Sequence, residues 1–224
     1  MYPSVQAQFR AFNEPFEGVV PWMYLDIKGL VTVGVGNLID PVGLATQLQF
    51  RFKPGAATPG ALATEDQIAE EWNTIKGDQS LAQKGYEACA PLTSLELTDD
   101  AINALIAARL SQNESYLRRQ TPFLNFDTWP ADAQLGLLSM AWAMGPGGPP
   151  SFPMFSAACA KMDFATAAEQ CKMNEAGNPG IVPRNQANQT LFQNAAAVLA
   201  GEAASGYVRS SLYYPQILTV PPAT

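Results

Sequence analysis

The chain has 224 residues, of which 47% are hydrophobic and 15% are charged, and its formal net charge is -7. That length can bury a sizeable core in one domain or in two lobes, and the composition is that of a folded protein. The acidic balance argues against nucleic-acid binding, which needs clustered Lys and Arg, and against adsorption to anionic membranes.

The chain has no histidine and three cysteines, Cys89, Cys159 and Cys171. Without histidine or a C-x-x-C spacing, a zinc centre and a His-based catalytic triad are excluded. Each cysteine lies in an Ala-rich or Met-containing helical context, which predicts buried free thiols. One disulfide plus one free thiol is the alternative in an oxidising compartment.

The first four residues, Met-Tyr-Pro-Ser, have no basic region followed by an apolar one, so they predict no signal peptide. The chain also has no run of the roughly 18 apolar residues that a membrane span needs. We therefore expect a protein that is made soluble in a cytoplasm.

The first predicted element is a helix over residues 5–13, which Ser4 can cap and which carries two phenylalanines on one side. Pro15 has no amide hydrogen to donate, so it is expected to end this helix. The helix would deliver Glu17 to the segment that follows.

Residues 17–37 predict a turn followed by a short strand. The quartet Asp26-Ile-Lys-Gly29 has Asp and Gly at the outer positions that a type I turn favours. Bulky residues then alternate with small or polar ones, in the order Val31, Thr32, Val33, Gly34, Val35 and Gly36. This is the period of a strand, and its small face leaves room for another group to come close.

Glu17 and Asp26 place two carboxyl groups beside this hairpin. A pair of carboxyl groups is what a glycosidase uses for catalysis. One such group must be protonated to give its proton to the leaving oxygen, and the other must be ionised to activate a water or to attack the anomeric carbon. Glu17 follows an apolar-rich segment, and desolvation there would favour the protonated form. Asp26 opens a polar turn, where backbone amides and solvent would keep it ionised.

The middle of the chain predicts loops and three helices. Residues 38–59 are rich in Pro, Gly and aromatic residues, which is typical of strand remnants and loops. The capping-box sequence Thr64-Glu-Asp-Gln67 predicts a helix over residues 65–76, and a second helix is expected over 80–88. Thr98 then caps a long helix that reaches residue 119, with two aspartates in its first turn where the helix dipole favours them.

The last part predicts further helices. A helix that begins at residues 128–130 is apolar on most sides and ends at a Gly- and Pro-rich stretch, residues 145–150. Trp142 inside it is predicted to be a core residue, with sugar stacking as the alternative. Helices are also expected over residues 164–173 and 183–201, and the tail after them could be an extended segment that packs on the body.

The string E-G-x5-Y-x-D-x2-G-x2-T-x-G-x-G, from Glu17 to Gly36, resembles the catalytic segment of the phage-type lysozymes, the muramidases used as endolysins. The sequence from Met140 to Gly145, followed by two phenylalanines, resembles the C-terminal lobe of these enzymes more loosely. This resemblance implies an α+β, lysozyme-like fold that is mostly α-helical. A small β-hairpin lobe and a larger helical lobe would be joined by a long helix, with the cleft between the lobes.

The resemblance also implies how the chain is divided. We expect a single catalytic domain over residues 1–224. Within it, residues 13–97 would form the hairpin lobe, which carries an insertion, residues 98–119 the linker helix, and residues 120–224 the helical lobe.

Roles for single residues follow from the same resemblance. Glu17 falls on the catalytic acid, and Asp26 falls on the carboxylate that holds the attacking water with the help of Thr32. Arg184 falls near the arginine that pairs with the catalytic glutamate, although an exposed Arg in a first helical turn is the alternative. Tyr24 and Asn37 complete the expected substrate-binding residues, and Asn37 stands where members often carry histidine.

The implied activity is that of an inverting hydrolase that needs no cofactor and cuts the β-1,4 bond between N-acetylmuramic acid and N-acetylglucosamine in peptidoglycan. Such a protein would act on the cell wall after release by a holin or delivery by a secretion system, as a monomer, and an injected toxin would have an inhibitor or immunity protein. Two alternatives stay open. One is a lysozyme-like module that binds cell-wall glycan without cutting it, and the other is a chitin or chitosan hydrolase.

Overall fold

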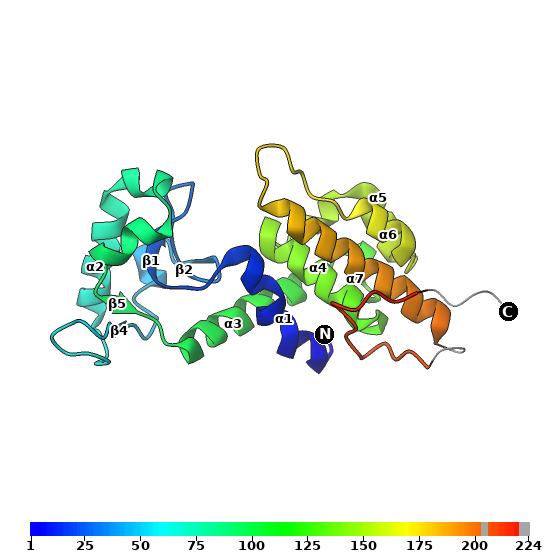
Figure 1. Ribbon diagram of the computed structural model, residues 1–224, viewed down its shortest axis with the longest axis horizontal. Coiled ribbons are helices and arrows are strands. Elements are labelled where there is room, and N and C mark those ends of the chain that lie inside the picture. Colours follow the sequence, from blue (N-terminus) through cyan, green and yellow to red (C-terminus); the bar gives the residue numbers. More distant parts are fainter. Residues whose placement is uncertain (203–205, 220–224) are drawn as a thin grey trace. The chain divides into compact units, whose positions relative to one another are not determined.

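The computed structural model describes residues 1–202 and 206–219 (Figure 1). It is mostly helical with a small antiparallel sheet, so the predicted α+β class is confirmed. The chain divides into two compact units. The first contains Met1–Phe16 and the chain from Ala108 onward, and the second is Glu17–Ala107. No helix of the described residues is long and apolar enough to cross a membrane.

The first unit is built from helices. It contains most of α1 (Pro3–Glu17), the end of α3 (Asp99–Leu117), α4 (Ala131–Met144), α5 (Pro153–Ala160), α6 (Phe164–Gln170) and α7 (Ile181–Gly201). Short 3-10 helices connect them: η4 (Thr121–Phe123), η5 (Phe126–Thr128) and η6 (Pro149–Ser151).

The core of this unit lies around α4. Helix α4 is buried on nearly all sides and packs along α7, which also packs against α6 (Figure 1). Edge-to-face aromatic pairs fill the space between the helices, among them Trp129 with Phe164 and Phe155 with Phe192, each 5.2 Å between ring centroids. Trp142 is 2% exposed and packs against Phe9, so the prediction that it is a core residue is confirmed.

The second unit carries the strands. A three-stranded antiparallel sheet runs in the order β1 (Val20–Leu25), β2 (Val31–Gly34) and β3 (Asn37–Leu38), and β4 (Arg51–Phe52) pairs with β5 (Leu95–Glu96). Helix α2 (Glu65–Gly77) packs against β1. The 3-10 helices are η1 (Val42–Leu44), η2 (Gln79–Gln83) and η3 (Tyr86–Leu92).

Local signals predicted two helix starts well. Thr64 and Gln67 form the complete capping box at the start of α2, and the Thr98 hydroxyl accepts a bond from the Ala101 amide at 3.2 Å at the start of α3. The helix expected over residues 80–88 is wrong. Two 3-10 helices occupy this region, because Gly85 between them adopts a φ of 79° that an α-helix cannot contain.

The first helix is longer than predicted. Helix α1 continues through Pro15 to Glu17, so the expectation that Pro15 ends it is wrong. Pro15 is exposed and lies in the last turn, where the loss of a single backbone hydrogen bond does not stop the helix. Ser4 does not cap it either, because the helix begins at Pro3 and Ser4 is already its second residue; the Ser4 hydroxyl donates to the Ser210 carbonyl at 2.6 Å.

The described tail, residues 206–219, packs on the first unit as expected. The buried Asp132 carboxylate accepts bonds from the Tyr213 and Tyr214 amides at 2.9 and 3.0 Å. Asn194 accepts a bond from the Leu218 amide at 2.8 Å and donates to Asp132 at 2.9 Å. Residues 203–205 and 220–224 of the predicted tail lie outside the described residues.

Candidate active site

Asp26 directly follows β1 and is fixed by its own turn. Its Oδ1 accepts bonds from the Lys28 amide at 2.8 Å and the Leu30 amide at 2.9 Å. Its backbone amide donates to the Leu30 carbonyl, and its carbonyl accepts from the Gly29 amide, both at 2.9 Å. Gly29 has a φ of 73°, which glycine adopts without strain, so the predicted chain reversal is confirmed. The turn holds the carboxylate through only one of its two oxygens.

Thr32 lies at the same end of the sheet as Asp26. It pairs with Tyr24 across β1 and β2, and its hydroxyl donates to the Leu30 carbonyl at 3.2 Å. The Leu30 backbone is therefore bonded to both Asp26 and Thr32. The structure brings these two predicted residues together, and Thr32 is only 4% exposed.

Glu17 is the last residue of α1 and is half-buried. Its Oε2 lies 3.2 Å from the point that a Cβ atom on Gly36 would occupy. The carboxylate is thus packed against the backbone of the turn between β2 and β3, where Gly36 has a φ of 67°. The small residues of the hairpin were predicted to leave room for another group, and at Gly36 that group is the Glu17 carboxylate.

The two carboxylates lie beside opposite ends of β1. Glu17 precedes the strand by three residues and contacts the turn that follows β2, whereas Asp26 follows the strand directly. The pairing of β1 with β2 is irregular between Val20 and Tyr24, where Pro21 has no amide to donate to the ladder. The sequence did not predict this bulge.

Asn37 holds the turn between β2 and β3. It is 5% exposed, and its Oδ1 accepts a bond from the Val35 amide at 3.2 Å. The same oxygen lies 3.1 Å from the point that a Cβ on Gly34 would occupy. This side chain therefore organises the backbone beside Glu17, and a contact with substrate stays a prediction.

Arg184 is buried in the first turn of α7 at 1% exposure, so the alternative of an exposed arginine is wrong. Its Nη1 donates to Asn13 Oδ1 at 3.0 Å and to the Ser139 carbonyl at 3.2 Å. Its guanidinium carbon lies 4.9 Å from the ring centroid of Phe16. These partners show that Arg184 holds the last turn of α1, the helix that ends at Glu17.

Two aromatic residues beside Tyr24 were not predicted as site residues. The Trp22 indole donates to the Tyr86 carbonyl at 3.1 Å, and the Tyr24 and Tyr86 rings lie 6.1 Å apart. The alternation of Trp22 and Tyr24 along β1 is a signal that could have found Trp22. No local signal points to Tyr86, because it comes from η3, far along the chain.

The three cysteines are buried and free, as predicted. Burial raises the pKa of Cys171 to about 12 and also raises the pKa of Cys159. The thiols of Cys159 and Cys171 therefore stay protonated at neutral pH and are poor nucleophiles. Within the ranges that the structure describes, no three His, Cys, Asp or Glu side chains gather closely enough to hold a metal ion.

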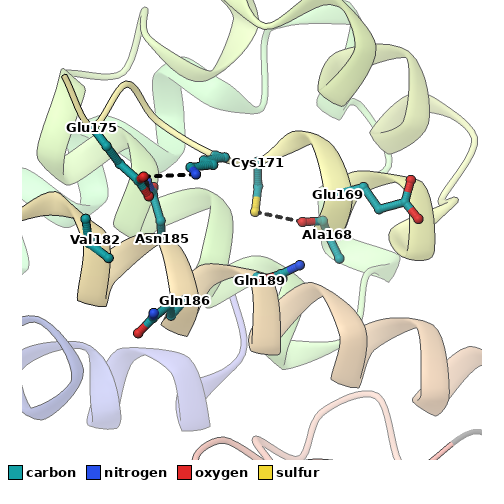
Figure 2. Close-up of a pocket in the computed structure, with 9 residues that line it drawn as sticks. Ala168, Glu169, Cys171, Glu175, Val182, Asn185, Gln186 and Gln189 are labelled. Carbon is teal, nitrogen blue, oxygen red and sulfur yellow. Dashed lines mark hydrogen bonds and ion pairs between the residues drawn. The ribbon is translucent and has the colours of Figure 1, made fainter.

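A cavity of about 310 Å³ lies in the first unit, and residues of α6, the following loop and α7 line it (Figure 2). Cys171 lies in its wall, with Sγ donating to the Ala168 carbonyl at 3.3 Å. Glu175 is engaged by Lys172 at 2.9 Å and by Asn185 at 3.0 Å. Because these polar groups satisfy one another, the cavity is a weaker candidate for catalysis than the segment around Glu17 and Asp26.

Comparison of the chain with models of protein families gave no match, and a search of curated proteins found no relative. The case for a function therefore rests on the residues and geometry of this chain.

Proposed function

We propose that this protein is a lysozyme-type peptidoglycan hydrolase, an inverting muramidase that cuts the β-1,4 bond between N-acetylmuramic acid and N-acetylglucosamine. The observation that carries the proposal is the arrangement around β1. Glu17 packs against the glycine turn beside one end of the strand, and Asp26 and Thr32 share the Leu30 backbone at the other end. These are the residues of the string that resembles the phage-type lysozymes.

In this proposal, Glu17 is the general acid that protonates the glycosidic oxygen. It is half-buried and held against the Gly36 backbone, which limits the directions that its carboxyl group can take. A fixed carboxyl group within hydrogen-bond reach of the leaving oxygen is what general acid catalysis requires.

Asp26 is the general base that activates the attacking water, and Thr32 helps to position that water. Two bonds from backbone amides fix one oxygen of the Asp26 carboxylate. An inverting enzyme needs its two carboxyl groups far enough apart to place a water between the base and the sugar.

Arg184 and Asn37 are given supporting roles. Arg184 orients the last turn of α1 through Asn13 and Phe16, and Asn37 orients the turn between β2 and β3. Both segments adjoin Glu17, the first in sequence and the second in space. Tyr24, across from Thr32, is proposed as a substrate contact.

The test is the rate at which purified peptidoglycan is digested by Glu17→Gln, compared with the wild type. We expect the rate to fall by about 10²- to 10⁴-fold, because a general acid supplies an acceleration of that size. Glu14→Gln is the matched control, because Glu14 is an exposed acid in the same helix that pairs only loosely with Arg10 at 3.7 Å. An unchanged rate in Glu17→Gln would remove Glu17 from the mechanism.

A further inference from the structure

Three aromatic side chains from distant parts of the chain gather beside β1. Trp22 and Tyr24 alternate along the strand with the buried Met23 and Leu25, so their side chains lie on the opposite face of the strand, where both are half-buried. Tyr86 opens η3, and its ring packs edge to face against Tyr24 at a centroid distance of 6.1 Å and an interplanar angle of 67°.

Polar contacts hold this group in place. The Trp22 indole donates to the Tyr86 carbonyl at 3.1 Å, which ties β1 to η3. The Lys53 ammonium lies 5.0 Å from the centroid of the Trp22 ring. That ammonium is itself fixed, since it donates to the Ala90 and Thr93 carbonyls at 3.0 Å each. The three rings are therefore positioned before any ligand binds, and Tyr86 is still 44% exposed.

This group continues directly from the candidate active site. Trp22 and Tyr24 lie two positions apart in β1, and Asp26 directly follows Leu25, the last residue of the strand. Thr32 is the cross-strand partner of Tyr24, and directly paired residues project to the same face of a sheet. Tyr24 therefore lies beside Thr32 on one face of the sheet, next to the turn that holds Asp26.

We propose that Trp22, Tyr24 and Tyr86 form a pyranose-binding subsite, in which a sugar ring of the glycan strand rests against aromatic rings. The inference rests on the proposed function, because the neighbouring catalytic residues define what kind of polymer reaches this face. The ring faces of Trp and Tyr carry negative charge density that attracts the C–H groups of a sugar face, and the polar tips of these side chains suit sugar hydroxyls.

A glycan is a better occupant of this surface than a folded protein. Stable protein interfaces bury roughly 1,200–2,000 Å², far more than three partly buried rings can offer. Trp and Tyr also have few rotatable bonds, so ordering them on binding costs little entropy. The subsite would bind a sugar of the glycan strand outside the pair of sugars whose bond is cut.

The experiment measures binding of soluble, peptide-free peptidoglycan glycan strands by isothermal titration calorimetry. The Glu17→Gln protein is used so that the strands stay intact. Adding Tyr86→Ala should weaken binding by about tenfold, in line with the energy of an aromatic contact. The change keeps the backbone carbonyl that Trp22 uses. Tyr86→Phe retains the ring and should bind like the parent.

Tyr116→Ala is the matched control, because Tyr116 is a tyrosine of similar exposure, 37%, in α3. It should bind the strands as tightly as the parent. Circular dichroism and thermal unfolding of each variant establish that it is folded. If Tyr86→Ala binds the glycan strands as tightly as the parent, the proposed subsite is wrong.

Failure of the subsite and failure of the proposed function give different results. If Glu17→Gln stops digestion but Tyr86→Ala binds normally, the enzyme assignment stands and the subsite is wrong. If Glu17→Gln digests peptidoglycan at the wild-type rate, the catalytic assignment is wrong, and the subsite stands only if Tyr86→Ala also lowers the affinity for glycan fragments too short to be cut.

Discussion

Asp26 and Thr32 are joined through one residue, Leu30, whose amide donates to Asp26 Oδ1 at 2.9 Å and whose carbonyl accepts from Thr32 Oγ1 at 3.2 Å. The turn thus sets the distance between the proposed base and the hydroxyl that assists it. Because the link runs through backbone atoms, it depends little on the identity of residue 30.

Thr32→Val removes the hydroxyl and keeps the shape of the side chain. We expect peptidoglycan digestion to slow by about a hundredfold, the cost of a small misplacement of a reacting group. The free energy of unfolding should change by only about 1 kcal/mol, because the Leu30 carbonyl keeps its bond from the Asp26 amide. Thr32→Ser should restore most of the rate. A Thr32→Val protein that digests at the wild-type rate would show that the hydroxyl has no part in the reaction.

Gly36→Ala should damage both stability and activity. A φ of 67° costs a residue with a Cβ about 1–2 kcal/mol, and the new methyl group would lie 3.2 Å from Glu17 Oε2 and displace it. Gly60→Ala is the control, since Gly60 has a φ of 74° but no heavy atom within 4 Å of the added Cβ. Urea unfolding should show similar destabilisation in both variants, and only Gly36→Ala should lose digestion. Equal activity in the two would mean that the position of Glu17 is unimportant.

Arg184→Met should destabilise the first unit by about 2–4 kcal/mol, because it leaves the buried Asn13 Oδ1 without its guanidinium donor and removes one bond to the Ser139 carbonyl. Arg184→Lys should be nearly as harmful, because an ammonium cannot reproduce the planar fork of the guanidinium. Chemical unfolding measures the loss, with the Arg119→Lys change at an exposed position of the same unit as the reference. Wild-type stability of Arg184→Lys would contradict the role assigned to the guanidinium.

The buried carboxyl group of Asp132 makes the free energy of unfolding depend on pH. Burial raises the pKa of this carboxyl above its unfolded value of 3.8. The folded protein therefore binds its proton more tightly than the unfolded chain does, and the contribution of Asp132 to stability is full below pH 3.8 and falls as the pH rises toward the folded pKa.

Asp132→Asn removes this titration while keeping the shape of the side chain. The stability of the wild type relative to this variant should decrease with increasing pH above 3.8, as measured by urea unfolding at a series of pH values. A relative stability that increases over the same range would contradict the assignment.

The sequence predicted the parts of the fold that depend on neighbouring residues. The capping box at Thr64, the start of α3 at Thr98 and the turn at Asp26 each involve residues within four positions of one another. Their signals are therefore complete in a short stretch of sequence. The two 3-10 helices around Gly85 were missed because the apolar pattern there fits an α-helix, and only the positive φ of that glycine excludes one.

The rest of the candidate site depends on contacts between distant residues. The approach of Glu17 to Gly36, the burial of Arg184 against Asn13, and the bond from Trp22 to the Tyr86 carbonyl all join different elements. A local pattern carries no information about such partners. The roles of Glu17, Asp26 and Thr32 came from a resemblance, and they stay predictions until the reaction is measured.

The most direct test of the account is the chemistry of the product. Purified peptidoglycan is digested with the wild-type protein, the new ends are reduced with borohydride, and the soluble fragments are identified by mass spectrometry. The account predicts muropeptides that end in reduced muramic acid. Intact sacculi with the protein bound to them, or fragments that end in reduced N-acetylglucosamine, would contradict it.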